Sequence, residues 1–368
     1  MTVEIARKLV ENLDKNIKET EIGAPFFSSP TYKVFPLTKE NFKCIKKIES
    51  NKKMAFVDGG NQEALGAPNF SVQINRVYFN VFRSQERCLK GCLSNRFEFF
   101  SSVYSCFKEN EIFYNTSLFP LRNEFETLLP KEADLSFNSY DRTVTTGTMR
   151  ADISRVGSIA RRFAEWVYAC HVVKNILGKG DILVLDGSLQ TAFTNESKYS
   201  YELYKEAQSR GVLVAGLSKT SGLFTSTGLS LLGAVHRLAD ETSYGSWFYP
   251  VAQAASSDHN AFIFVTKLHP KAERVFRFEI YGPQFAKMSE NDVNEAFSQL
   301  ASNAQDISFP GYPYGLIDAD QFARIRDEEV EGFQILLLSQ ISRQSKWEKF
   351  VKDIRAGDAH DVLNMLGG

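Results

Sequence analysis

The chain has 368 residues and a formal net charge of −1, with 43% hydrophobic and 24% charged residues. This composition is ordinary for a globular protein and gives no overall electrostatic attraction to nucleic acid or to an anionic membrane. The length allows one large domain with added segments.

The chain shows no sign of a membrane or secretory route. No run of about 18 apolar residues occurs, and the first residues lack the charged-then-apolar order of a signal peptide. The five cysteines stand in apolar or helical contexts, which argues against a disulfide framework. We therefore expect a cytoplasmic protein without a membrane segment.

The first part of the chain predicts an amphipathic helix, a loop and a run of strands. Residues 3–19 place apolar side chains at helical spacing, and residues 22–37 contain three prolines and a glycine. The later segments are rich in β-branched and aromatic residues and predict an antiparallel meander, with strands at residues 54–58, 70–82, 96–107 and 111–119.

The second part alternates helices with strands. Residues 149–177 keep a helical apolar period up to Gly178, and a short strand over 182–186 follows directly. The remaining predictions are helices over 198–210 and 289–303, with Ser289 and Asp292 in a capping box, a strand over 212–217, a hairpin over 261–281 and mainly helix over 319–366.

Two predicted strands end in an aspartate. Asp58 closes the apolar run M-A-F-V and is followed by two glycines, and Asp186 closes I-L-V-L and is followed by Gly-Ser. In open α/β sheets, ligands bind outside the carboxyl ends of the strands. If the two strands were neighbours, their carboxylates would form an acidic pocket suited to a divalent cation.

The order of these elements resembles the ribonuclease H-like fold, in which the first and fourth strands lie side by side. The resemblance extends to the NurA nuclease family, whose motifs occur here in the same order. They are M-A-F-V-D-G-G, R-R-F-A-E-W, V-L-D-G-S-L, G-L-S-K-T-S, K-L-H-P-K-A-E-R-V-F-R and Y-P-Y-G-L-I-D-A-D. We expect an α/β mixed sheet flanked by helices, with an N-terminal helix and linker (1–53), the nuclease domain (54–326) and a C-terminal helical extension (327–368).

The resemblance implies a metal-dependent deoxyribonuclease that processes DNA ends, with 5'-3' exonuclease and single-strand endonuclease activity. It also implies a homodimer that works with a HerA-type hexameric ATPase. Hydrolysis by two metal ions suits such a site, and carboxylates suit Mn²⁺ or Mg²⁺. We assign Asp58 and Asp186 as catalytic metal ligands, with Asp58 the better candidate to bridge two ions.

Two further carboxylates are candidate ligands, and each has a plainer interpretation. Glu165 lies in the long helix, where the family carries an acidic residue, but it could simply pair with Arg161 or Arg162. Asp320 is our preferred fourth metal ligand, and Asp318 could serve as a helix N-cap with no chemistry.

The remaining candidates concern proton transfer and DNA. His269 could order a water, protonate a leaving group or bind metal, or it could be a turn residue that bonds the backbone. Lys219 could meet a phosphate or be an exposed loop lysine. Basic residues of the hairpin, Lys267, Lys271, Arg274 and Arg277, and the rings of Tyr312 and Tyr314 could contact DNA, although surface solvation and core packing explain them nearly as well.

Other functions remain open. Asp-Gly-Gly after a strand also suits an actin-like or sugar-kinase ATPase, but we find no second glycine-rich adenosine motif. A haloacid-dehalogenase phosphatase needs a second aspartate two residues after the nucleophile, where this chain has Gly60 and Ser188. A catalytically inactive adaptor for a translocase is the third alternative, and the acidic pair argues against it.

Overall fold

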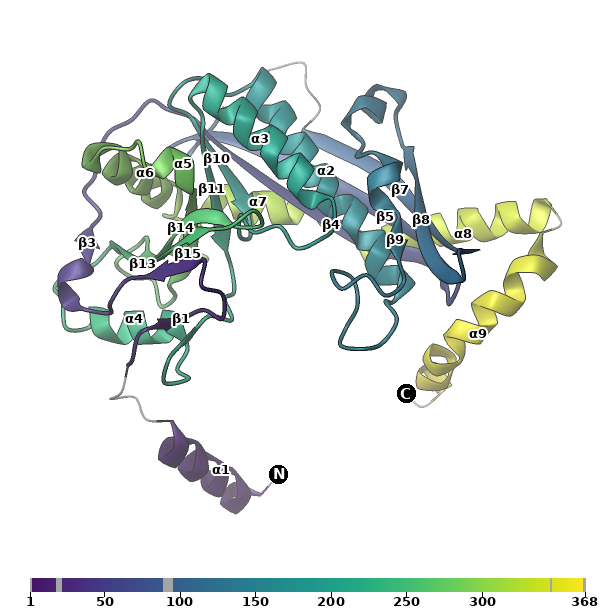
Figure 1. Cartoon of the computed structure of the whole chain (residues 1–368), viewed down its shortest axis with the longest axis horizontal. Coiled ribbons are helices and arrows are strands. Elements are labelled where there is room, and N and C mark those ends of the chain that lie inside the picture. The colour runs from purple at the N-terminus through teal and green to yellow at the C-terminus, as the bar shows by residue number, and fades with distance from the viewer. Residues whose placement is uncertain (1, 18–21, 89–94, 345, 367–368) are drawn as a thin grey trace. The chain divides into compact units, whose positions relative to one another are not determined.

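The computed structural model describes residues 2–17, 22–88, 95–344 and 346–366, and it is a mixed α/β protein with a large mixed sheet and flanking helices (Figure 1). The chain forms two compact units. Unit 1 comprises Met1–Asn51, Val184–Gln190 and Leu213–Tyr314, and unit 2 comprises Lys52–Leu183, Thr191–Val212 and Gly315–Gly368. The domain limits expected from the sequence are not tested by this division and stay a prediction.

Unit 2 is built on the predicted meander. Each strand pairs antiparallel with the next, and the members are β4 (Met54–Ala67), β5 (Phe70–Arg83), β7 (Arg96–Lys108) and β8 (Glu111–Pro120). The short strands β6 (Glu86–Arg87) and β9 (Phe137–Asn138) pair with β5 and β8. The meander that begins with the Asp58 strand is therefore confirmed, but this strand continues to Ala67, so the prediction that it ends at Asp58 is wrong.

The long helix α2 (Ile153–Asn175) packs on this meander. The Asp152 side chain caps its first turn by accepting a hydrogen bond from the Ser154 amide, and Val156, Ile159, Ala160 and Phe163 are fully buried. Gly157 faces β5 so closely that a Cβ there would lie 2.6 Å from the Gln73 side-chain amide. The helical period of the sequence therefore reflects a buried face, and the helix begins four residues later than predicted.

Unit 1 contains an antiparallel set of strands that the sequence revealed only in part. β14 (Asn260–Lys267) and β15 (Phe276–Tyr281) form the predicted hairpin, and β13 (Trp247–Ala255) and β11 (Leu213–Ser218) pair with its two edges. The short strands β2 (Tyr32–Val34) and β3 (Lys43–Cys44) pair with β13. A separate two-stranded sheet is formed by β1 (Pro25–Phe26) and β12 (Phe224–Thr225). The sequence did not predict β13.

The helices of unit 1 are short. α6 (Glu290–Asn303) has the predicted capping box between Ser289 and Asp292. Two further helices, α4 (Leu231–Ala239) and α5 (Gly282–Phe285), were not predicted from the sequence. In α4, Leu231, Val235 and Leu238 pack into the same core as Trp247 of β13.

The position of β10 (Ile182–Asp186) in the sheet shows whether the predicted strand neighbours are present. This strand stands between β11 and β4 in the strand order β2-β13-β14-β15-β11-β10-β4-β5-β7-β8-β9, and α3 (Glu196–Arg210) follows it. The two strands that carry Asp58 and Asp186, β4 and β10, are thus neighbours, although the meander has one strand more than the three that precede the helix in the expected order. This is the ribonuclease H-like arrangement.

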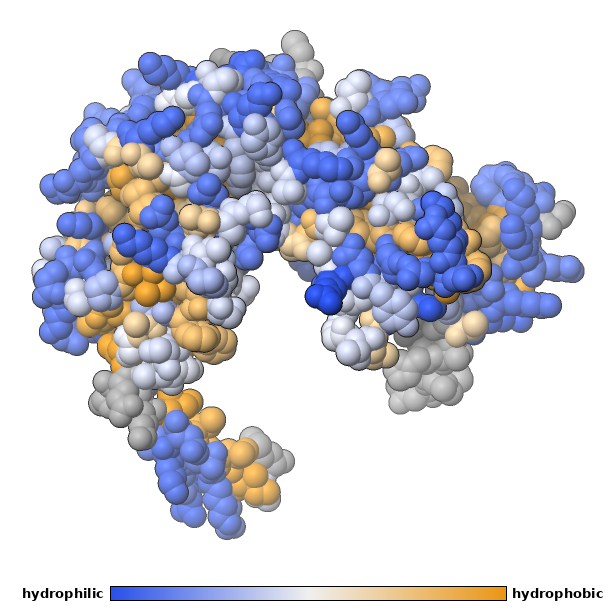
Figure 2. Space-filling view, viewed as in Figure 1, coloured by the Kyte–Doolittle hydropathy of each residue, from blue (hydrophilic) through white to orange (hydrophobic). Residues whose placement is uncertain are grey.

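Both ends of the chain are helical, as expected. α1 (Val3–Asn16) has no buried residue, and Ile5, Leu9, Val10 and Leu13 are all exposed; Figure 2 shows apolar residues at the surface of this helix. The C-terminal part holds α7 (Tyr314–Ala323), α8 (Asp327–Arg343) and α9 (Trp347–Leu366). Within the described ranges, no helix is long and apolar enough to cross a bilayer.

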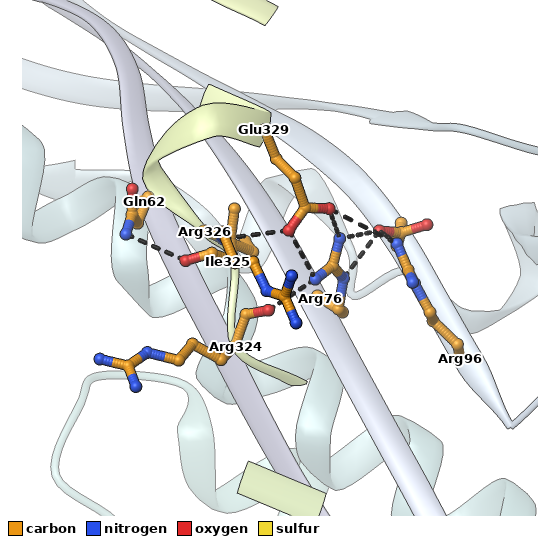
Figure 3. A network of polar contacts seen from close by, with 8 residues as sticks. Gln62, Arg76, Arg96, Arg324, Ile325, Arg326 and Glu329 are labelled. Atoms are coloured by element: carbon orange, nitrogen blue, oxygen red, sulfur yellow. Dashed lines mark hydrogen bonds and ion pairs between the residues drawn. The ribbon is translucent and has the colours of Figure 1, made fainter. Parts of the chain in front are cut away.

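A buried arginine anchors the start of α8 to the meander (Figure 3). Arg76 of β5 is 3% exposed, and its guanidinium lies 2.6 Å from a carboxylate oxygen of Glu329 and 2.7 Å from one of Glu98. It also donates to the Arg324 carbonyl at 2.6 Å. Because a buried guanidinium is costly unless it is paired, these contacts fix the segment that leads into α8.

We predict that Glu329→Gln loosens this anchor. The hydrogen bond from Arg76 lowers the pKa of Glu329 despite the opposing effect of burial, so the stabilisation is present above the unfolded-state pKa of about 4.3 and is lost as the pH falls through the folded-state pKa. The substitution should cost about 1–3 kcal/mol at pH 7 and progressively less in acid. Denaturant unfolding across pH measures this, and an unchanged cost down to pH 3 would contradict it.

Candidate metal centre

Three aspartates come together in the structure. Asp58 of β4, Asp186 at the end of β10 and Asp320 of α7 each offer a carboxylate oxygen, and these oxygens lie within 4.8 Å of one another. Asp58 and Asp186 are half-buried and Asp320 is exposed. Like charges at this separation repel one another, so such a group needs positive charge nearby.

Asp58 is held by the strand that carries it. It lies opposite Tyr78 in the pairing of β4 with β5, and its Oδ1 accepts a hydrogen bond from the Gly59 amide at 2.7 Å. The apolar residues before it, Met54 to Val57, are fully buried and fix the strand in the core. The carboxylate is therefore placed by a rigid element.

Asp186 stands where β10 ends and the chain turns. Gly187 follows with a φ of 106°, a conformation that only glycine adopts without strain. An oxygen of Asp186 lies 2.6 Å from the Lys219 ammonium, which follows β11. The lysine that the sequence suggested for a phosphate thus contacts the acidic group itself.

Asp320 is exposed on α7, whereas Asp318 is buried. α7 begins at Tyr314, so Asp318 lies inside the helix and the N-cap role predicted for it is wrong. Instead it accepts hydrogen bonds from Asn80, at 2.7 Å, and from Arg87. Of the two aspartates, Asp320 is therefore the one that belongs to the group of three carboxylates.

Glu165 is not a member of the group of three. It is 8% exposed on α2, pairs with Arg161 and lies 3.8 Å from an Arg162 nitrogen. It nevertheless packs against the residue after Asp58, because a Cβ at Gly59 would lie 2.4 Å from its Oε1. The ion pairs of the plainer interpretation are thus present, and the ligand role stays a prediction.

His269 begins the loop between β14 and β15. Its Nδ1 accepts a hydrogen bond from the Lys271 amide at 3.1 Å, so the neutral ring carries its proton on Nε2. This is the turn contact that the plainer interpretation expected. The ring is half-buried, and its predicted catalytic role is not tested by this contact.

The predicted DNA contacts differ in accessibility. Lys271 and Arg274 are exposed, and the Arg274 guanidinium lies over the Phe309 ring at 5.3 Å. Tyr312 is 2% exposed, with its ring against Phe276 and Phe309. Its ring offers no open face to a base in this arrangement, which argues against the stacking predicted for it, whereas Tyr314 is 40% exposed.

Arg277 was expected to add positive charge to the hairpin surface. Its side chain is only 12% exposed and pairs with the fully buried Glu279. The sequence analysis did not single out Glu279, because its position within a strand of alternating residues carried no sign that a charge is buried there.

The strand order and the acidic group define the class: a ribonuclease H-like α/β protein with an acidic centre at the neighbouring strands β4 and β10. A family model described as the NurA domain matches residues 52–325. The chain therefore belongs to the NurA family, and this membership supports a nuclease.

Solved structures agree at the level of the fold. The NurA nuclease from Sulfolobus solfataricus is 15% identical, with 94% of this chain and 99% of that chain covered and a TM-score of 0.53. A second NurA structure is 5% identical, with 91% of this chain and 96% of that chain covered and a TM-score of 0.46. No curated protein sequence matches the chain.

We predict that Gly59→Ala disturbs the packing between Asp58 and Glu165. The new methyl group would fall 2.4 Å from the Glu165 carboxylate, which is held by two arginines and cannot move freely. Overpacking of this kind costs about 1–3 kcal/mol. Urea unfolding measures it, with Gly222→Ala as the control because a Cβ there meets nothing within 4 Å. Equal stabilities of the two variants would refute the close contact.

Proposed function

We propose that the protein is a metal-dependent nuclease that acts on DNA ends, with Asp58, Asp186 and Asp320 as ligands of Mn²⁺ or Mg²⁺. The observation that carries the proposal is the group of three carboxylate oxygens within 4.8 Å of one another. Family membership supports the nuclease part of the proposal. Two ions, as the sequence analysis expected, would suit phosphodiester hydrolysis.

The residues fit a hard divalent cation. Carboxylate oxygens are the ligands that Mg²⁺ and Mn²⁺ prefer, and three of them lie within 4.8 Å of one another here. When bound, such ions would activate a water and stabilise the leaving oxygen. Around them, the chain's own residues bind and orient the substrate.

The other residues take supporting roles in this proposal. Glu165 is a further ligand candidate next to Gly59, and His269 could hold or move a proton through Nε2. Lys219, Lys271 and Arg274 would contact phosphates, and the partly exposed ring of Tyr314 takes the stacking role in place of Tyr312.

The finer activity and the partners come from the family resemblance. We propose 5'-3' exonuclease and single-strand endonuclease activity in the cytoplasm, in a homodimer that works with a HerA-type hexameric ATPase. The exposed apolar residues of α1, together with Ile335 and Leu336 of α8, are candidate contact surfaces for these partners.

Two alternatives make different predictions. An inactive adaptor would dock on the translocase and cleave no DNA even in its presence. An actin-like or sugar-kinase ATPase would turn over ATP without a partner. The acidic group favours the nuclease over both, because neither alternative requires three aspartates around one point.

The first prediction is that cleavage depends on the aspartates. Asp58→Ala or Asp186→Ala should lower cleavage of linear and nicked DNA at least about a hundredfold, because a metal ion stabilises the transition state by several kcal/mol. Asp181→Asn is the matched control, since this 8% exposed carboxylate accepts two backbone hydrogen bonds before β10. Equal cleavage by wild type and both alanine variants would contradict the proposal.

The second prediction is that Lys219 and a cation share Asp186. Lys219→Met removes the ammonium that lies 2.6 Å from this carboxylate and should destabilise the metal-free protein by about 1 kcal/mol. Mn²⁺ should then raise the melting temperature of the variant more than that of wild type. Lys205→Met, on the exposed side of α3, serves as the control. An equal Mn²⁺ effect in all three proteins would show that the lysine and the cation do not share this site.

A further inference from the structure

A fully buried carboxylate lies behind the turn that follows Asp186. Glu279 of β15 is 0% exposed, and its Oε2 accepts a hydrogen bond from the Leu189 amide at 2.8 Å. Leu189 is the third residue after Asp186. The side chain of Glu279 is therefore tied directly to the main chain of the turn that carries the acidic residue.

Two side chains, Arg277 and His259, hold Glu279 in place, and a third, Tyr32, holds His259. Arg277 donates from Nε to Oε1 at 2.6 Å, and His259 Nε2 lies 2.9 Å from Oε2. The other ring nitrogen of His259, which is 1% exposed, lies 2.9 Å from the Tyr32 hydroxyl. The network thus runs from Tyr32 of the edge strand β2, through His259 just before β14 and Glu279 of β15, to the turn after β10.

The charge of Glu279 is compensated inside the protein. Burial alone would raise the pKa of Glu279, but Arg277, the hydrogen bond from His259 and the Leu189 amide outweigh it, and the pKa is lowered. A buried carboxylate persists only with such partners, and one with several donors on two oxygens has little freedom to move.

The opposite side of the turn is equally restricted. The Gly187 amide donates a hydrogen bond to the Leu217 carbonyl at 2.9 Å, and Gly216 is the residue before Leu217 in β11. A Cβ at Gly216 would fall 2.6 Å from the Gly187 carbonyl oxygen and 3.3 Å from a Leu189 methyl carbon. Gly216 of β11 and Glu279 of β15 are paired residues in the sheet. The turn after Asp186 is therefore in contact with one residue of each strand of this pair.

From these contacts we propose that Glu279, held by Arg277 and His259, is a positioning residue that fixes the 187–189 turn so that the Asp186 carboxylate stays within the acidic group. The inference rests on the proposed metal site and adds residues that lie outside the group of three aspartates. Mutation of a residue that orients a metal ligand in this way typically lowers metal affinity 10–100-fold.

The test is Mn²⁺ binding measured by calorimetry on the full chain. Glu279→Gln keeps the size of the side chain but removes its charge and one acceptor oxygen, and it should weaken Mn²⁺ binding at least about tenfold. Asp181→Asn, which removes a buried acceptor at the other end of β10, should change the affinity less than about twofold even if it lowers stability. Equal affinities in both variants would overturn the inference.

A second variant guards against misfolding of Glu279→Gln. Gly216→Ala leaves every charged group intact and pushes on the Gly187 carbonyl, so it should also weaken Mn²⁺ binding; unchanged binding would count against the inference. Asp58→Ala separates the two claims. If wild type binds no Mn²⁺ that depends on Asp58, the proposed function fails, whereas Asp58-dependent binding that both turn variants retain removes only the positioning role.

Discussion

Repulsion among three carboxylates is the constraint on which the rest of the structure depends. At 4.8 Å in a partly buried site, each pair of charges repels by about 3 kcal/mol. A chain that keeps such a group must hold each member on a rigid element and supply compensating charge. Lys219 supplies positive charge at Asp186, and a divalent cation would supply more at the point where the three carboxylates meet.

Each aspartate is positioned by a different element of local structure. Asp58 follows four buried residues in the middle of a long strand, and Asp186 ends a strand whose following turn is tied to Glu279 and Leu217. Asp320 depends on the close packing of α7, where a Cβ at Gly315 would lie 2.1 Å from the Phe56 ring. Buried Asp318 in the same helix pairs with Arg87, and the exposed Asp320 stays accessible.

The parts of this site that the sequence predicted share a simple signal. Asp58 and Asp186 each follow an apolar run and precede glycine, so their placement on buried strands follows from local pattern and their proximity follows from the strand order. Only Asp186 ends its strand, because β4 continues to Ala67. Asp318 could not be assigned correctly, because its role depends on Arg87 and Asn80 far away in the chain. Glu279 and His259 were missed because a buried charge looks like an exposed one until its partners are known.

Tyr312 is a residue whose burial could not be predicted from the local sequence. A tyrosine in F-P-G-Y-P-Y is compatible with an exposed ring for base stacking. The Tyr312 ring instead packs against Phe309 and against Phe276, which lies in β15, far away in the chain. The strand β13 was not foreseen although Trp247 and Tyr249 are fully buried, because a proline and small residues interrupt its pattern. Long-range packing decided these cases.

The most direct test of the metal centre is anomalous diffraction from crystals of the protein soaked in Mn²⁺. The account predicts an anomalous peak with carboxylate oxygens of Asp58, Asp186 and Asp320 about 2.0–2.6 Å away, the range that oxygen ligands keep from hard divalent cations. A Mn²⁺ peak elsewhere, with these three carboxylates bound only to lysine, arginine or water, would contradict it.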